Sequence, residues 1–244
     1  MSVLAILPAR YGSTRFPGKP LAPIAGLPMI QRTWQGAVRS QRLRDVIIAT
    51  DDARILEAAR AFGASVALTR ADHPTGTDRL AEVAEGLDDD IVVNIQGDEP
   101  LIQAPVLEAL IDALASEPRA AMSTVVHPLA ADAVEDRNRV KARLDEAGRA
   151  VDFTRQVTEP GYDWQHAGLY AYRRSFLLEF VRLERTKREE AEGLEQLRAL
   201  GHGRWIQAAI VDDWHSIPVD VPADVRAVEQ ALIENAREQD GGSS

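Results

Sequence analysis

The sequence contains no cysteine. This absence excludes disulfide bonds, thiolate metal sites and a cysteine nucleophile, so any bound metal must have oxygen or imidazole ligands. Lysine is scarce as well: only Lys19, Lys141 and Lys187 occur among the 28 basic residues, and arginine supplies the rest. Skewed codon use would explain that bias, but Lys19 follows a glycine-rich stretch and is therefore a candidate functional cation.

Long apolar runs are also missing, and positive charge does not predominate. No stretch approaches the length of a transmembrane helix, and the apolar segment Val3–Leu7 is too short for a signal peptide, so we expect a cytoplasmic protein without a membrane partner. The net charge of −10 argues against a nucleic-acid partner, because that function needs a broad basic face. With 244 residues and 45% hydrophobic content, the chain can bury the core of one domain, which we expect at 1–240 before a disordered tail at 241–244.

The first half of the chain alternates apolar runs rich in β-branched residues with segments whose apolar residues recur at helical spacing. The expected strands are Val3–Leu7, Val46–Thr50, Ser65–Leu68, Ile91–Ile95 and Met122–Val126. The expected helices are Pro28–Val38, Asp52–Phe62, Thr77–Gly86 and Ala104–Ala115, with Asp52 and Thr77 as N-caps and Gly63 as a helix stop. Repeated strand–helix–strand units predict an α/β fold of three layers, with a mostly parallel sheet covered by helices on both faces.

The second half has a different pattern. Residues 139–145 and 150–154 predict a β-hairpin with a turn at Gly148, and with the strand His166–Tyr172 they indicate a small β-rich insertion at about 128–172. The remaining expected elements are helices at Arg173–Val181, Thr186–Leu200 and Pro222–Glu238 and a late strand at Trp205–Val211. Lys141 and Arg143 alternate on the hairpin, a pattern typical of a strand that faces solvent.

The strongest local signal is the loop that follows the first strand. It contains two glycines, a Ser-Thr pair and three cations, Arg10, Arg15 and Lys19. Ligands of open parallel sheets bind beyond the carboxyl ends of the strands, and backbone amides and cations at that place suit a triphosphate. The loop is not a P-loop, because Gly12 and Gly18 lie one residue too far apart and a proline follows the lysine. A glycine-rich surface turn with scattered cations is the alternative interpretation.

Two aspartates are candidate metal ligands. Asp98 follows the strand Ile91–Ile95, so we expect it at the same edge of the sheet as the cationic loop. A carboxylate there can hold Mg²⁺, which takes hard oxygen ligands and shares them with phosphates. Asp220 precedes the last expected helix. Either residue could instead cap a turn or a helix, and the residues alone favour that simpler role for Asp220.

These segments, in this order, resemble the 3-deoxy-manno-octulosonate (Kdo) cytidylyltransferase family, also called CMP-Kdo synthetases. The resemblance rests on the opening loop and on the blocks Thr75–Arg79, Val93–Pro100, His166–Arg173, Leu194–Arg198 and Val219–Pro222. It covers nearly the whole chain. It implies a nucleotide-diphospho-sugar transferase (glycosyltransferase-A-like) fold and a homodimer formed through the β-rich insertion. The implied reaction converts CTP and Kdo to CMP-Kdo and pyrophosphate for lipopolysaccharide assembly, with Mg²⁺ as cofactor.

The resemblance also implies roles for individual residues. It assigns triphosphate and nucleotide contacts to Arg10, Ser13, Arg15, Lys19, Thr75, Gly76 and Arg79, and contacts with the acidic sugar to Gln96, Arg155, His166, Tyr170, Glu195 and Gln196. It assigns Mg²⁺ to Asp98 and Asp220, which would carry catalysis together with Arg15 and Lys19. Without the resemblance, His166 and Tyr170 fit a core strand equally well, and Glu195 and Gln196 fit a solvated helix face.

Three features depart from the family pattern. The segment from Arg155 to His166 is short, the usual Phe-Ser-Arg step appears as Phe153–Arg155 after Asp152, and Arg188 replaces a leucine. They leave the CTP chemistry intact but leave the exact sugar open. A cytidylyltransferase for a related acidic sugar, of the 8-amino-Kdo or sialic acid type, is therefore one alternative. A sugar-1-phosphate nucleotidyltransferase and a non-catalytic nucleotide-binding protein on the same fold are others.

Overall fold

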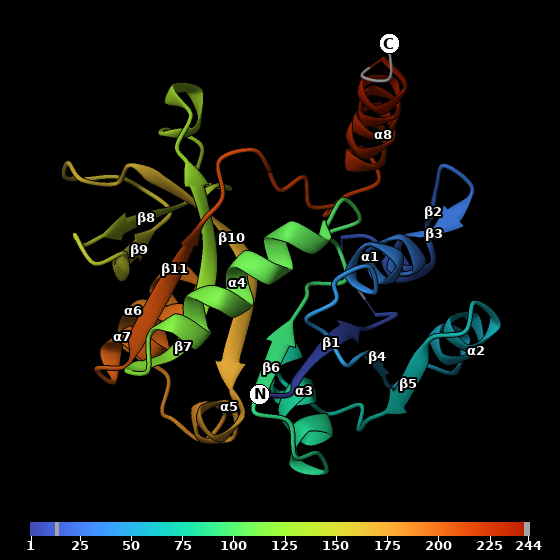
Figure 1. The fold of residues 1–244 in the computed structure, drawn as a ribbon, viewed down its shortest axis with the longest axis horizontal. Coiled ribbons are helices and arrows are strands. Elements are labelled where there is room, and N and C mark those ends of the chain that lie inside the picture. The colour runs from blue at the N-terminus through green and yellow to red at the C-terminus, as the bar shows by residue number, and fades with distance from the viewer. Residues whose placement is uncertain (13–14, 242–244) are drawn as a thin grey trace.

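A single nine-stranded sheet forms the centre of the molecule (Figure 1). The computed structural model describes residues 1–12 and 15–241, with side chains up to Glu234. The strand order is β5-β4-β1-β6-β10-β7-β11-β9-β8. The strands are β1 (Val3–Ala9), β4 (Asp45–Thr50), β5 (Ser65–Leu68), β6 (Ile91–Asn94), β7 (Ala120–Pro128), β8 (Val140–Leu144), β9 (Arg149–Thr154), β10 (Trp164–Arg173) and β11 (Trp205–Ile210).

The sheet is mixed: the prediction of a mostly parallel sheet holds for β5, β4, β1 and β6 and again for the neighbours β7 and β11, whereas β10 and the β8–β9 hairpin pair antiparallel with their neighbours. Strands β5, β4, β1 and β6 are parallel neighbours, whereas β10 lies between β6 and β7 and runs antiparallel to both. The physical reason is the connection: the chain passes from β7 through the β8–β9 hairpin to β10 without the crossover helix that parallel neighbours require. The segment expected as an insertion at about 128–172 thus contributes β10 to the middle of the main sheet.

Helices cover both faces of this sheet (Figure 1). One face carries α1 (Met29–Ala37), α2 (Ala53–Ala61) and α4 (Ala104–Ser116), and the other carries α3 (Gly76–Glu85), α5 (Arg174–Phe180) and α7 (Gln196–Gly201). Strand β1 explains the two cores, because successive side chains of a strand point to opposite faces. Val3, Ala5 and Leu7 pack on the first face, whereas Leu4 and Ile6 pack on the second.

Helix ends show where local sequence signals succeed and where they fail. Asp52 caps α2 as predicted, since its carboxylate accepts from the amide of Arg54 at 2.9 Å. Thr77 is not the cap of α3. Thr75 takes that place, with a reciprocal capping box in which its hydroxyl accepts from the amide of Asp78 and its own amide donates to the Asp78 carboxylate.

The expected helix Thr186–Leu200 is wrong as one unit. Gly193 has a φ of 63° and ends α6 (Lys187–Glu192), after which α7 begins anew at Gln196. A glycine adopts this left-handed conformation without the steric cost that a side chain would bring. The break matters for function because it turns Glu195 and Gln196 toward the interior of the protein.

The C-terminal segment crosses back to the start of the chain. Helix α8 (Asp224–Gly241) packs near the small hairpin of β2 (Pro23–Ile24) and β3 (Leu27–Pro28), where Ile24, Met29, Val219 and Val228 form a separate apolar cluster. In Figure 1 this helix stands apart from the main sheet. None of the helices in the described part of the chain is long and apolar enough to cross a membrane.

Candidate active site

The loop after β1 carries Lys19 to the carboxyl edge of the sheet. Gly18 has a φ of 71°, and a Cβ atom at this position would lie 3.1 Å from the ring of Tyr11. The amide of Gly18 donates to the carbonyl of Tyr11 at 2.9 Å, which closes the loop on itself. Glycine is therefore required at this position both for its backbone conformation and for space. The short 3₁₀ helix η1 (Lys19–Leu21) follows directly and holds Lys19 over the end of β6.

Asp98 and Asp220 meet at Lys19. The Lys19 ammonium lies 2.7 Å from the carboxylate of Asp98 and 3.6 Å from that of Asp220. The backbone fixes this approach, because the amide of Val219 donates to the carbonyl of Asp98 at 3.0 Å. Arg15 adds a second cation, with two guanidinium nitrogens 3.3 and 3.1 Å from the Asp220 carboxylate. Two stretches more than a hundred residues apart thus place their carboxylates around one cation.

A cavity of about 1210 Å³ opens beside these charges. Nine residues with predicted roles line it, namely Arg15, Gln96, Asp98, Arg155, His166, Tyr170, Glu195, Gln196 and Asp220. Arg15, Asp98 and Asp220 come from the loop after β1, the segment after β6 and the segment before α8. Gln96 also follows β6, Arg155 follows β9, His166 and Tyr170 lie on β10, and Glu195 and Gln196 lie at the break between α6 and α7. All six residues assigned to the sugar therefore face one cavity.

The remaining nucleotide assignments do not line this cavity. Thr75 caps α3, and Gly76 packs its Cα against Pro8, since a Cβ there would lie 3.3 Å from the proline ring. Arg10 is half-buried. Arg79 is fully buried, and its guanidinium lies 2.8 Å from the carboxylate of Asp51. Arg79 lies in the first turn of α3, and its side chain pairs with the loop after β4. It therefore supports the structure around the site and does not line the cavity. Ser13 lies outside the described residues.

His166 and Tyr170 form a neutral wall of the cavity. The hydroxyl of Thr124 donates to the carbonyl of Leu169 at 2.9 Å, so it accepts from Nε2 of His166, which is also 2.9 Å away. Burial, reinforced by the charges of His127 and Arg155, lowers the pKa of His166 to about 3. Burial likewise raises the pKa of Tyr170 above its usual value, and its hydroxyl donates to the side-chain oxygen of Gln196 at 3.1 Å. Both side chains are uncharged at neutral pH.

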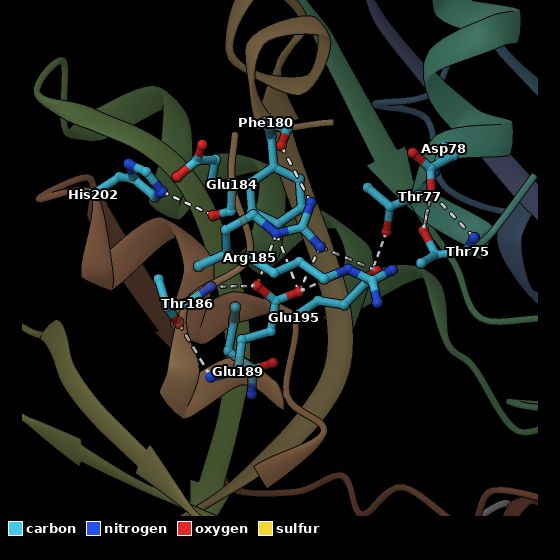
Figure 2. Close-up of polar contacts among 12 residues, drawn as sticks. Thr75, Thr77, Asp78, Phe180, Glu184, Arg185, Thr186, Glu189, Glu195 and His202 are labelled. Carbon is cyan, nitrogen blue, oxygen red and sulfur yellow. Dashed lines mark hydrogen bonds and ion pairs between the residues drawn. The ribbon is translucent and has the colours of Figure 1, made fainter. Parts of the chain in front are cut away.

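A buried polar network behind the cavity fixes Glu195 (Figure 2). The hydroxyl of Thr77 on α3 donates to Oε2 of Glu195 at 2.7 Å. Arg198, one turn further along, lies 3.9 Å from Oε1 and makes hydrogen bonds of 2.9 and 3.1 Å to Glu189. The network joins α3, whose N-cap is Thr75, to the two short helices α6 and α7, whose connection lines the cavity. These contacts hold Glu195 in one orientation although it lies at the break between two helices.

Replacing Glu189 by glutamine is expected to lower the free energy of unfolding by about 3 kcal/mol, because Arg198 would then remain buried without its charged partner. Arg198 and Glu189 are each 5% exposed, so solvent cannot compensate for the loss. Urea unfolding followed by circular dichroism measures the change. Glu190→Gln is the matched control, since its neighbour Glu190 is exposed, and we expect it to change stability by less than about 0.5 kcal/mol. Equal stability of the two variants would contradict the assigned importance of the buried pair.

Several buried polar atoms of the cavity wall have no hydrogen-bond partner among the described residues. They are Oε2 of Glu99, Nε2 of His127, Oε1 of Gln165, Oε1 of Glu195 and Nε2 of Gln196. Buried polar groups in native proteins are nearly always hydrogen-bonded, and an unsatisfied group costs about 1–3 kcal/mol. Their concentration on one wall indicates that a polar ligand completes the site.

Comparison with known proteins identifies the family. The family model described as "Cytidylyltransferase" matches residues 4–206. The 3-deoxy-manno-octulosonate cytidylyltransferase of Myxococcus xanthus is 47% identical over 237 residues, which cover 94% of this chain and 96% of the relative. The enzyme of the same name from Protochlamydia amoebophila is 42% identical over 245 residues, or 94% of each chain. The chain belongs to the 3-deoxy-manno-octulosonate cytidylyltransferase family.

The fold is shared with a solved member of this family. A structure of CMP:2-keto-3-deoxy-manno-octonic acid synthetase complexed with CTP superposes with a TM-score of 0.91 at 37% identity, covering 96% of this chain and all of the other. The mixed α/β nucleotidyltransferase-like fold is therefore established for this member of the cytidylyltransferase family.

Sequence reasoning missed several residues of this family member's cavity. Glu99 is buried beside Asp98, where burial raises the pKa of its carboxyl to about 8, and it accepts from the hydroxyl of Ser216. His127 and His215 also line the cavity and contact each other. Glu99 stands inside an expected motif, so the adjacency to Asp98 was an available signal. The two histidines lie 88 positions apart with no pattern around them, and only the fold brings them together.

Lys141 was expected to face solvent, and that prediction is wrong. It is fully buried, and its ammonium donates to the carbonyls of Asp136 at 2.6 Å and Arg155 at 3.2 Å. Strand β8 pairs with β9 along one edge and with β10 along the other, so Lys141 lies on a strand enclosed on both edges and not on an exposed hairpin. Burial lowers the pKa of this lysine below its usual value. Lys141 thus connects two loops whose residues Asp136 and Arg155 line the cavity.

Proposed function

We propose that this chain transfers CMP from CTP to Kdo and releases pyrophosphate, the activity that the names of its relatives state. One observation carries the proposal: Lys19, Arg15 and two carboxylates converge at one end of a cavity whose other residues include uncharged hydrogen-bonding groups, the cation Arg155 and the carboxylate of Glu195. The first end suits a triphosphate, because its oxygens are multiply charged. These other residues suit a polyhydroxylated acidic sugar, because its hydroxyl groups both donate and accept hydrogen bonds and its carboxylate needs a cation.

The reaction requires two anions to meet. The anomeric hydroxyl of the sugar attacks the α-phosphorus of CTP in line with the departing pyrophosphate, and the sugar also carries a carboxylate. Lys19 and Arg15 supply the positive charge that offsets this repulsion and stabilises the charge that builds on the leaving group. Preorganised charges of this kind contribute about a hundredfold or more each to a rate. Arg155, whose Nε donates to the carbonyl of Glu192 at 2.8 Å, supplies a cation at the sugar end.

Asp98 and Asp220 fit a Mg²⁺ ion. Both present carboxylate oxygens to one cation already, the Lys19 ammonium, within 3.6 Å. No cluster of three or more histidine, aspartate or glutamate side chains suited to a metal occurs in residues 1–12 and 15–234. Mg²⁺ commonly needs only one or two protein carboxylates, because substrate phosphates and water complete its six ligands. When bound, the ion supplies charge neutralisation at the phosphates and acidifies the attacking hydroxyl.

Release of pyrophosphate from CTP tests the function directly. We expect turnover with CTP, Mg²⁺ and Kdo, and little with ATP, GTP or UTP. Replacing Kdo by 8-amino-Kdo, sialic acid and a sugar 1-phosphate in the same assay separates the proposed activity from those of related nucleotidyltransferases. A thermal shift with each nucleotide separates catalysis from mere binding. Stabilisation by CTP without turnover of any sugar would favour the non-catalytic alternative and contradict the proposal.

We further propose that the active protein is a homodimer. Val151 on β9 lies in the segment assigned to dimerisation and is 40% exposed, which leaves an apolar side chain for a partner to cover. Light scattering during size exclusion should give about twice the chain mass of 26.8 kDa. A mass of one chain at micromolar concentration would end this part of the proposal.

A further inference from the structure

His127 lies near the end of strand β7 and lines the cavity. It is the penultimate residue of β7, stands opposite Gln165 on β10, and is 3% exposed. His215, from the segment between β11 and α8, contacts it edge-on, with ring centroids 4.8 Å apart and an interplanar angle of 81°. Both imidazoles line the cavity. His127 is therefore held between the sheet and the segment that also supplies Asp220.

The surroundings of His127 determine which of its nitrogens carries the proton. Nδ1 lies 3.1 Å from the carbonyl oxygen of Pro128 and 3.3 Å from Nδ1 of His215. A carbonyl oxygen can only accept, so Nδ1 of His127 is the N–H donor. Burial, together with the charges of His215 and Arg139, lowers the pKa of the ring. Nε2 of the neutral ring is consequently an acceptor, and it is buried with no partner in the part of the chain that the structure describes.

An acceptor in this position selects the chemistry of its ligand. It repels a carboxylate or a phosphate and favours a group that donates a hydrogen. His166, with its Nε2 donating to Thr124, also presents its other nitrogen as an acceptor. The charge of Arg139 acts on His127 and that of Arg155 acts on His166, and both disfavour an ammonium group beside these rings. An uncharged hydroxyl group donates a hydrogen bond and carries no positive charge, so it suits this position.

We propose that His127 is a specificity-determining residue that accepts a hydrogen bond through Nε2 from a hydroxyl of the sugar, with His215 as the residue that positions its ring. This inference rests on the proposed function, because it identifies a residue of the cavity that recognises the sugar. It goes beyond the roles assigned from the sequence, none of which includes His127 or His215. It also predicts that the hydroxylated sugar is preferred over an analogue with an amine at the same place.

Steady-state pyrophosphate release with His127→Phe and His127→Gln tests the proposal. Phenylalanine keeps the ring and its contact with His215 but removes the acceptor, whereas the side-chain oxygen of glutamine can reach the place of Nε2. We expect His127→Phe to raise the KM for Kdo by about tenfold or more while the KM for CTP changes by less than about twofold, the typical effect of leaving a substrate hydroxyl without its partner. His127→Gln should recover much of that loss. His202→Phe is the control, since His202 contacts the carbonyl of Glu184 at the surface (Figure 2).

The outcomes separate this inference from the proposed function. A wild-type enzyme that uses CTP and Kdo, together with a His127→Phe variant of unchanged KM for Kdo, would overturn the role of His127 alone. An equal rise in the KM for both substrates would overturn it as well, because it would indicate a general distortion. Kdo analogues that each lack one tail hydroxyl provide the positive identification. One of them should be used poorly by the wild type, and His127→Phe should not distinguish it from Kdo. Absence of turnover with any sugar in the wild type would overturn both proposals.

Discussion

Replacing Asp98 by asparagine is expected to lower turnover by about a thousandfold or more at saturating CTP, Kdo and Mg²⁺. The carboxylate contacts the Lys19 ammonium at 2.7 Å, and the same ammonium lies 3.6 Å from Asp220, so the two aspartates are held around one place. Asparagine keeps the shape but loses the charge that would hold a divalent ion. Turnover measured over a range of Mg²⁺ concentrations should not recover at high metal.

Asp112→Asn is the matched control for this prediction. Asp112 lies on α4, pairs with Arg42 at the surface and is 58% exposed, so its variant should retain full activity. The far-ultraviolet circular dichroism and melting temperature of Asp98→Asn should resemble those of the control, because the lost group is partly open to solvent. Activity of Asp98→Asn within a few-fold of the control would refute the assigned metal role. Recovery of activity at high Mg²⁺ would instead limit Asp98 to a contribution to metal affinity.

The first half of the fold could be predicted from the sequence because each signal there is local. Apolar runs such as Ser65–Leu68 coincide with the observed strand, and helix signals such as Asp52 and Gly63 mark the observed ends of α2. The second half could not be predicted to the same extent. The position of β10 in the middle of the sheet depends on pairing with β6 and β7, residues that are distant in the chain, and no local pattern specifies such pairing.

The residues of the candidate site likewise divide into those that motifs predict and those that only the fold brings together. Motifs placed Asp98, Asp220 and Lys19 in the site, and the fold brings these three together. The cavity wall around His127 and His215 has no motif, because its chemistry arises from a tertiary contact and from buried atoms without partners. Lys141 shows the opposite failure, since an alternating pattern that is typical of a solvent-facing strand occurs on a strand that pairs along both edges, and the lysine is buried. Patterns along the chain identify residue types, whereas burial is decided by what packs against them.

Replacing Lys19 by alanine is expected to lower kcat/KM for CTP by about a hundredfold or more with little effect on folding. The side chain is 17% exposed and its ammonium stands between two carboxylates that line the cavity, so its removal takes away a positive charge available to the leaving pyrophosphate. Its ion pairs contribute about 1 kcal/mol to stability at this exposure, which corresponds to a fall of about 2–4 °C in melting temperature. Kinetics with varied CTP and a thermal melt of the same sample measure the two effects.

Two further variants test whether the effect of Lys19→Ala comes from the loss of the positive charge at this position. Lys19→Arg keeps the positive charge but has a different shape, so it should recover part of the lost kcat/KM while the alanine variant recovers none. Lys187→Ala removes an exposed lysine at the start of α6 and should behave as the wild type. If alanine at position 19 lowered the melting temperature without lowering kcat/KM for CTP, Lys19 would be a structural ion-pair partner of Asp98. Arg15, which pairs with Asp220 from the same loop, would then be the loop's remaining candidate cation for the transfer.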